Sequence, residues 1–224
     1  NGAAAWGARL AEVDYVPVFP ITPQTEIVEA LAERAARGEI GARLVVLESE
    51  HSMLTAAGAA SVTGVRAFTA TSSQGLLYAM EMLYSVAGWR APFVLVNVSR
   101  AVAAPVTLHS DHGDVLAARD SGFLQLHAAT CQEALDLVLL AYRMAEHPNV
   151  RLPALVNLDG FLLSFTREPV ELLDPELARR FVGNFEPGAS AFRASRPVSQ
   201  AVAVLGGGPY SYFRYEMHRA AEHA

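Results

Sequence analysis

The chain has 224 residues, of which 52% are hydrophobic and 18% charged, and its formal net charge at pH 7 is −6. A chain of this length buries about 70% of the surface that its unfolded form exposes, so this composition predicts a packed domain and excludes disorder over most of the length. The 17 Lys and Arg residues form no basic run, which excludes the electrostatic surface that nucleic acid requires.

Apolar runs alternate with helical patterns through most of the chain. The runs are apolar throughout rather than alternating, which is typical of a parallel sheet with helices on both faces. The sequence therefore predicts a doubly wound, mostly parallel α/β fold. The predicted strands cover residues 13–19, 42–48, 66–71, 92–99 and 152–159, and the predicted helices cover 23–38, 49–64, 72–88 and 130–147.

The pattern changes near residue 185, where Pro and Gly become frequent and no periodicity continues. Residues 1–185 are predicted to form the α/β domain, and residues 186–224 an irregular tail leading toward a following domain. Gly206, Gly207 and Gly208 lie in this tail without the G-x-G-x-x-G spacing of a dinucleotide site, so they are a weak signal for one.

The single cysteine, Cys131, limits which cofactors this chain can hold alone. It excludes an internal disulfide and any iron–sulfur cluster built without other chains, and it favours the reducing cytoplasm. The apolar stretches fall short of the roughly 20 residues that a membrane-spanning helix needs, so no membrane is expected as a partner.

Ligands of such a sheet bind beyond the carboxyl ends of the strands, so the strand-to-helix turns are the candidate sites. The first turn, FPITPQTE (19–26), places Pro20 and Pro23 around Thr22. Taken locally, Thr22 is more typical of a helix cap than of a ligand contact. The second turn, LESEHS (47–52), holds Glu50 at a helix start, where it either interacts with the helix dipole or serves as a buried acid/base group.

The third turn, TSSQG (71–75), contains Ser73 and Gln74, which either cap the next helix or line a polar pocket. It lacks the first Gly of G-x-S-x-G, which disfavours a serine hydrolase. Arg100 follows the fourth strand. It is placed to bind a carboxylate with two hydrogen bonds, or else to pair with a neighbouring acidic side chain.

The loop after Arg100 contains HSDHGD, which suggests a metal site. Imidazole and carboxylate ligands suit zinc or iron, and a metal-dependent hydrolase using His109, Asp111, His112 and Asp114 is one alternative function. The motif lacks the first His of H-x-H-x-D-H, however, and no distant ligand completes it. A hydrogen-bonded loop in which the two Asp residues cap a turn is the favoured interpretation.

Five blocks in order resemble one protein family. They are FPITPQTEIVEAL, LESEHSMLTAAGA, FTATSSQGLLYAMEMLY, SRAVAAP followed by HSDHGDVLAARDSGF, and LVNLDGFLLS. From about residue 2 to about residue 220 the chain is similar to the N-terminal, pyrimidine-binding domain of the alpha subunit of the 2-oxoacid:ferredoxin oxidoreductases, its pyruvate-specific members in particular. The resemblance implies oxidative decarboxylation of a 2-oxoacid, with pyruvate as the first candidate, to an acyl-CoA and carbon dioxide, with electrons passed to ferredoxin.

The resemblance also implies thiamine diphosphate as the cofactor, in a thiamine diphosphate-binding fold of the pyrimidine-domain type. By position, Glu50 is expected to contact N1′ of the aminopyrimidine. Thr22 and Arg100 are expected to hold the oxoacid, and Ser73 and Gln74 to contribute to the cofactor-binding turn.

The same resemblance indicates what other chains supply. The family's G-D-G block for diphosphate and magnesium is absent, because Gly113-Asp114 continues as Val115. Mg²⁺, iron–sulfur clusters, coenzyme A binding and ferredoxin contacts are therefore expected from partner subunits or domains, and an oligomer is expected. The alternative within such a complex is a non-catalytic assembly or regulatory module.

Overall fold

The structure, a computed structural model, describes residues 1–188, 191–198 and 207–224. The strands in these ranges are β1 (Tyr15–Val18), β2 (Arg43–Val46), β3 (Phe68–Thr71), β4 (Val94–Ser99), β5 (Leu124–His127) and β6 (Ala154–Asp159). The helices are α1 (Gly2–Leu10), α2 (Thr25–Ala36), α3 (Glu50–Val62), α4 (Ser73–Tyr78), α5 (Met80–Gly88), α6 (Gly113–Ala117), α7 (Cys131–Ala145), α8 (Pro175–Val182) and α9 (Gly207–His223).

Every strand pair in these ranges is parallel. β1 pairs with β2, and the other strands form a sheet in the order β3-β4-β6-β5. The two parts meet at β1 and β3, through a bridge between Tyr15 and Ala67 and a hydrogen bond of 2.7 Å from the Thr69 hydroxyl to the Pro17 carbonyl. The spatial order is therefore β2-β1-β3-β4-β6-β5, and the predicted parallel α/β fold is confirmed.

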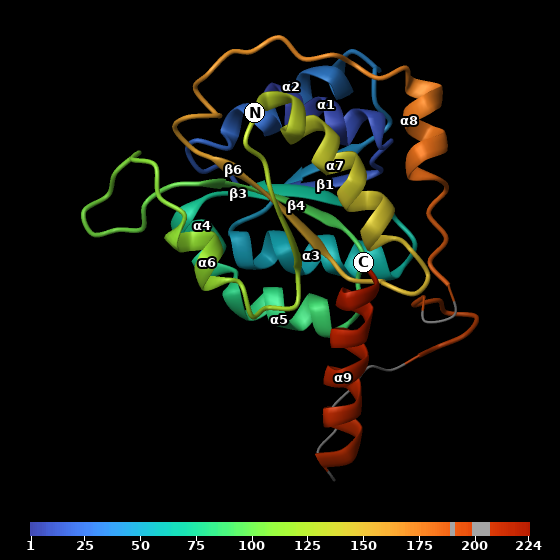
Figure 1. Cartoon of the computed structure of the whole chain (residues 1–224). Coiled ribbons are helices and arrows are strands. Elements are labelled where there is room, and N and C mark those ends of the chain that lie inside the picture. The colour runs from blue at the N-terminus through green and yellow to red at the C-terminus, as the bar shows by residue number, and fades with distance from the viewer. Residues whose placement is uncertain (189–190, 199–206) are drawn as a thin grey trace.

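Helices cover both faces of this sheet (Figure 1). α1, α2, α7 and α8 pack on one face, and α3, α4, α5 and α6 pack on the other. The alternation of side chains along β4 supplies both cores: Val94, Val96 and Val98 join the first, while Phe93 and Leu95 join the second. Burial on both faces explains why this segment reads as one continuous apolar run.

A buried ion pair ties the amino-terminal end of β3 to two helices. Arg66 donates two hydrogen bonds of 2.7 Å to the carboxylate of Glu146 in α7, and one of 2.7 Å to the carbonyl of Ala11 after α1. Both charged side chains are buried. Each is compensated by the other, as buried charges must be.

The structure differs from the predicted elements at several places. The helix expected over 72–88 is divided at Ala79 into α4 and α5. Short or small-residue elements were not predicted, namely α1, β5, α6 and α8. α9 lies within the segment expected to be irregular, of which Gly206 falls outside the described residues, and the proposed division near residue 185 stays a prediction. In the described ranges, no helix is both long enough and apolar enough to cross a bilayer.

Candidate functional site

Four strand-to-helix turns bring the predicted site residues to one edge of the sheet. Thr22 follows β1, Glu50 follows β2, Ser73 and Gln74 follow β3, and Arg100 follows β4. In parallel strands the carboxyl ends meet at the same edge, so these turns become neighbours although they lie far apart in sequence.

Arg100 is the centre of one group of contacts. Its side chain is largely buried, at 8% exposure. Nη1 donates to the Thr22 carbonyl at 2.8 Å, and Nη2 donates to Oε1 of Gln74 at 2.6 Å. Nε is buried and has no partner among the described residues. The guanidinium is therefore held in place by neutral acceptors while its charge stays free of any described carboxylate, which removes the acidic-pair interpretation.

Thr22 does not cap α2, so the local prediction of a helix cap was wrong. The helix begins at Thr25 with Gln24 at its N-cap position, because Gln24 is drawn inward and donates from Nε2 to the carbonyl of Phe19 at 2.9 Å. The Thr22–Pro23 peptide is cis. The Thr22 side chain is exposed, and its carbonyl is the group that holds Arg100.

Glu50 is the first residue of α3 and is only 6% exposed. The capping role belongs to its neighbour Ser49, whose Oγ accepts from the Ser52 N–H at 3.2 Å. The carboxylate of Glu50 makes no hydrogen bond or ion pair with another described residue. It is thus a nearly buried acid that is not needed for capping, at a helix terminus whose dipole favours a negative charge.

Gly75 allows the backbone of α4 to lie directly against this carboxylate. A Cβ at this position would stand 2.5 Å from Oε1 of Glu50 and 2.5 Å from Oγ1 of Thr71. Thr71 Oγ1, Ser72 Oγ and Gln74 Nε2 are buried, and none has a hydrogen-bond partner in the described part of the chain. Buried polar atoms are normally paired, so the Glu50 carboxylate and these atoms of the turn after β3 fit a polar ring that would pair with them.

Ser73 is fully buried and forms hydrogen bonds with residues of three segments. Its N–H donates to Oδ2 of Asp114 at 2.9 Å, and its Oγ lies 2.6 Å from Oε1 of Gln74 and 3.0 Å from the Ala101 carbonyl. Its φ of 47° is in the left-handed region, which a non-Gly residue adopts only when its surroundings hold it there. Ser73 therefore orients Gln74, and its hydroxyl is already used within the turn.

Asp114, which the sequence suggested as a turn cap, is a buried carboxylate with a wider structural role. Its oxygens accept from Ser73 N, Asn97 Nδ2, Ser99 Oγ, Arg100 N and Val115 N, at 2.7 to 3.4 Å. These bonds join α4, α6 and the end of β4 beneath the site. Several hydrogen bonds to one ionised carboxylate compensate its burial.

The metal interpretation of the HSDHGD loop finds no support. Asp114 is used in the network below the site, and Oδ1 of Asp111 accepts from the Gly113 N–H at 2.5 Å, as expected for a loop lock. No cluster of three or more His, Cys, Asp or Glu side chains in the described ranges is arranged to hold a metal ion. The ligand set that a metal-dependent hydrolase needs is therefore not brought together.

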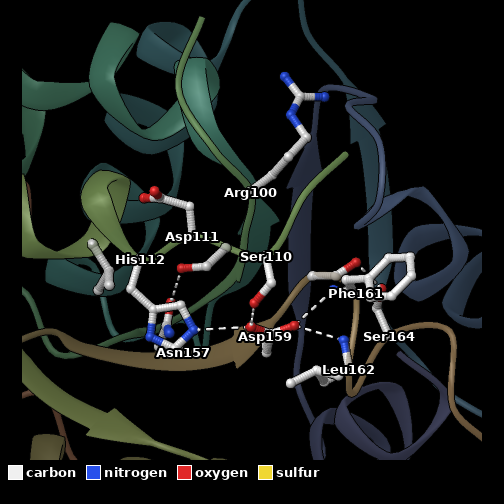
Figure 2. A network of polar contacts seen from close by, with 12 residues as sticks. Arg100, Ser110, Asp111, His112, Asn157, Asp159, Phe161, Leu162 and Ser164 are labelled. Carbon is white, nitrogen blue, oxygen red and sulfur yellow. Dashed lines mark hydrogen bonds and ion pairs between the residues drawn. The ribbon is translucent and has the colours of Figure 1, made fainter. Parts of the chain in front are cut away.

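A second network lies at the end of β6 and was missed (Figure 2). Oδ2 of Asp159 accepts from the Ser110 hydroxyl and lies 3.1 Å from Nε2 of His112, while Oδ1 accepts from the N–H groups of Phe161 and Leu162 at 2.8 and 2.6 Å. Burial raises the pKa of the Asp159 carboxyl, but these hydrogen bonds together outweigh it, so its pKa lies below the ordinary value. The only sequence signal was an acidic residue closing an apolar strand.

Two hollows of the described surface lie away from these turns. One is lined by Arg9, Glu12 and Asp14 among others, and another by Cys131 and Ser164 among others. Neither includes the predicted site residues.

Known proteins are similar in sequence to this chain over most or all of its length. A family model described as "Pyruvate flavodoxin/ferredoxin oxidoreductase, thiamine diP-bdg" matches residues 6–224. Pyruvate synthase subunit PorA of Pyrococcus abyssi is 43% identical, over 100% of this chain and 56% of its own length. PorA of Methanocaldococcus jannaschii is 46% identical, over 89% of this chain and 51% of its own length.

Ketoisovalerate oxidoreductase subunit VorA of Pyrococcus furiosus is 43% identical, over 100% of this chain and 56% of its own length. The chain thus spans about half the length of the curated relatives it matches.

A solved structure shares the fold. It is the 2-oxoglutarate:ferredoxin oxidoreductase from Magnetococcus marinus with 2-oxoglutarate, coenzyme A and succinyl-CoA bound, with a TM-score of 0.76. It is 19% identical and covers 99% of this chain and 43% of that one. The resemblance drawn from the five sequence blocks is confirmed. The chain belongs to the pyruvate flavodoxin/ferredoxin oxidoreductase family and comprises its thiamine diphosphate-binding domain.

Proposed function

We propose that this chain is part of a thiamine diphosphate-dependent 2-oxoacid:ferredoxin oxidoreductase and supplies the residues that face the cofactor's aminopyrimidine and the oxoacid. Pyruvate is the first substrate to test, because relatives named as pyruvate synthase subunits match most or all of the chain. A branched-chain oxoacid is the second, because a ketoisovalerate oxidoreductase subunit is 43% identical.

The observation that carries this proposal is the environment of Glu50. A nearly buried carboxylate without a described partner stands against the backbone at Gly75, close to the unpaired Thr71 hydroxyl, in a turn that also carries the unpaired polar atoms of Ser72 and Gln74. Thiamine diphosphate, when bound, supplies a nucleophilic carbon and an electron sink for decarboxylation. Glu50 would share a proton with N1′ of the aminopyrimidine, and the neighbouring polar atoms would pair with the ring's other groups.

Arg100 is suited to the carboxylate of a 2-oxoacid. Its buried Nε has no described partner, and its position is fixed by Thr22 and Gln74 without a counter-charge. A substrate carboxylate would therefore meet a preoriented cation. Thr22, whose carbonyl binds this guanidinium, has an exposed side chain, and its hydroxyl would orient the substrate's oxo group.

Other subunits or domains complete the proposed enzyme. With Cys131 as its single cysteine, this chain cannot build the iron–sulfur clusters that would carry electrons to ferredoxin. Diphosphate and Mg²⁺ contacts and coenzyme A binding are likewise assigned to partners. One of these partners would cover the surface near Glu50. An oligomeric complex in the reducing cytoplasm is the setting that we propose.

The test is substitution of Glu50 in the complete complex. Purified complex carrying Glu50→Gln is assayed with a panel of 2-oxoacids, coenzyme A and ferredoxin, and thiamine diphosphate binding to the cofactor-depleted complex is measured by calorimetry. We expect oxoacid-dependent ferredoxin reduction to fall by about 100-fold to 10,000-fold, as for loss of a general acid/base group. Glu48→Gln is the matched control, because Glu48 is exposed two residues away and bonds only to Ser52.

Unchanged turnover and cofactor affinity in the Glu50→Gln complex would contradict the proposal. That result would favour the alternative of a non-catalytic assembly or regulatory module. Loss of activity with equal loss in the Glu48→Gln complex would also count against a specific role of Glu50.

A further inference from the structure

The loop between β4 and α6 extends beyond the body of the domain (Figure 1). It begins directly after Arg100, and residues 103–106 are exposed. The chain then returns to its starting point, where the Ala101 N–H donates to the His109 carbonyl at 3.1 Å. The returning segment, Ser110 to His112, therefore runs beside the base of Arg100.

Asp159 holds this returning segment to the sheet. Its Oδ2 receives the Ser110 hydroxyl and faces Nε2 of His112 at 3.1 Å (Figure 2). The loop is anchored here by side chains from its own end to a carboxylate of β6, across 47 to 49 positions of sequence. His109 is the useful contrast, because its imidazole makes no hydrogen bond, ion pair or ring contact with a described residue.

The other oxygen of the same carboxylate fixes the turn after β6. The N–H groups of Phe161 and Leu162 donate to Oδ1, at 2.8 and 2.6 Å. Gly160 lies between β6 and these two residues, and its N–H donates to the Ser99 carbonyl at 2.8 Å. A Cβ on Gly160 would stand 3.1 Å from Cγ of Pro23. This turn thus packs between the end of β4 and the turn that carries Thr22.

We propose that Asp159 is a positioning residue: it holds the loop of residues 101–112 and the turn of residues 160–164 together beside the end of β4, and so fixes Arg100, which follows that strand, for the oxoacid carboxylate. The last step rests on the function proposed above. In this proposal Asp159 acts through Arg100. The Arg100 side chain is held at 8% exposure, and its Nε has no described partner. Removing the anchor frees the loop without removing any group that touches substrate.

The ring of His112 is held between two strands. It faces the Asp159 carboxylate of β6 at 3.1 Å, and it stacks on His127 of β5 with the ring centroids 6.4 Å apart. The contact with Asp159 is therefore made by a ring whose position is also set by β5.

Hydrogen exchange of the native complex, read by mass spectrometry, tests the anchor directly. Ser110→Ala with His112→Ala removes the loop contacts and keeps Asp159 and the 160–164 turn. We expect the amide of Ala101 and those of residues 109–116 to exchange about tenfold faster, with β4 unchanged. His109→Ala is the matched control and is expected to exchange like wild type. Unchanged exchange in the double variant overturns the proposal.

Steady-state kinetics then test the link to Arg100. In the Ser110→Ala/His112→Ala complex the KM for the oxoacid is expected to rise about tenfold with kcat changed less than about twofold. Faster exchange with an unchanged KM overturns the positioning role. Because exchange does not depend on the reaction, failure of the anchor is distinguished from failure of the proposed function, which the Glu50→Gln complex reports.

Discussion

Replacing Gly75 by alanine would place a methyl group in space that Glu50 and Thr71 occupy. The added Cβ would lie 2.5 Å from Oε1 of Glu50 and 2.5 Å from Oγ1 of Thr71. Non-bonded atoms prefer roughly 3.5 Å or more, so each oxygen must move by about 1 Å. The change therefore displaces the Glu50 carboxylate while leaving its chemistry intact.

The effects on stability and on activity are expected to differ widely. Both displaced atoms end short, rotatable side chains, so their movement costs about 1 kcal/mol. Alanine within a helix regains roughly 0.5–1 kcal/mol relative to glycine. The free energy of unfolding should therefore change by less than about 1 kcal/mol. A misplacement of about 1 Å at a reacting group can lower the rate about 100-fold.

The assay compares the Gly75→Ala and Gly88→Ala complexes. Gly88 ends α5, and a Cβ there would meet nothing within 4 Å, so this matched control should leave activity unchanged. Thermal unfolding, thiamine diphosphate affinity and 2-oxoacid-dependent ferredoxin reduction are measured for both. Wild-type affinity and turnover in Gly75→Ala, with the protein folded, would refute the reasoning that the position of Glu50 matters.

Three further predictions concern stability. Arg66→Met leaves Glu146 buried without its cation, so urea titration should show a loss of about 3–5 kcal/mol, partly regained when both charges are removed. Burial, and then a neighbouring imidazole, lowers the pKa of His127, so the stability that depends on a neutral His127 is fully present above about pH 6.5 and is lost as the pH falls below that value. Urea unfolding of wild type and His127→Gln at about pH 7.5 and about pH 5.5 checks this. In Gly160→Ala the Cβ would stand 2.1 Å from the Ser99 carbonyl, a backbone atom that cannot rotate away, so unfolding should be easier by about 1–3 kcal/mol or more.

The fold was readable from sequence where local pattern and burial agree. β4 and β6 are buried at every position and appear as apolar runs. α3 is bounded by the cap at Ser49 and by the turn at Gly64, both of which have recognisable residue types. β5 was missed because it is four residues long, with Gln125 and His127 at half-buried or exposed positions. Its place is fixed by pairing with β6 rather than by its own composition.

The site was readable only in part, for a related reason. Glu50 stands out as an acidic residue at a recognisable helix start, and Arg100 as a charged residue directly after a buried strand. Gly75, Asp114 and Asp159 act through contacts with residues 14 to 49 positions away or through close approach of a backbone, and no local spacing records such contacts. The cap prediction for Thr22 failed because Gln24 turns inward to the Phe19 carbonyl and moves the start of α2.

The strand order explains why the site lies at this place on the sheet. From β1 the chain passes to β2 on one side and then returns to β3 on the other, so the direction of winding reverses between β1 and β3. The helices that follow leave on opposite faces and open a crevice beyond the carboxyl ends of these strands. Thr22 follows β1 and Gln74 follows β3, one on each side of the reversal, and Arg100 joins them by a hydrogen bond to each. The topology therefore favours a ligand beyond the carboxyl ends of β1 and β3, and the roles proposed for Glu50 and Arg100 name the ligand: an aminopyrimidine and a 2-oxoacid carboxylate.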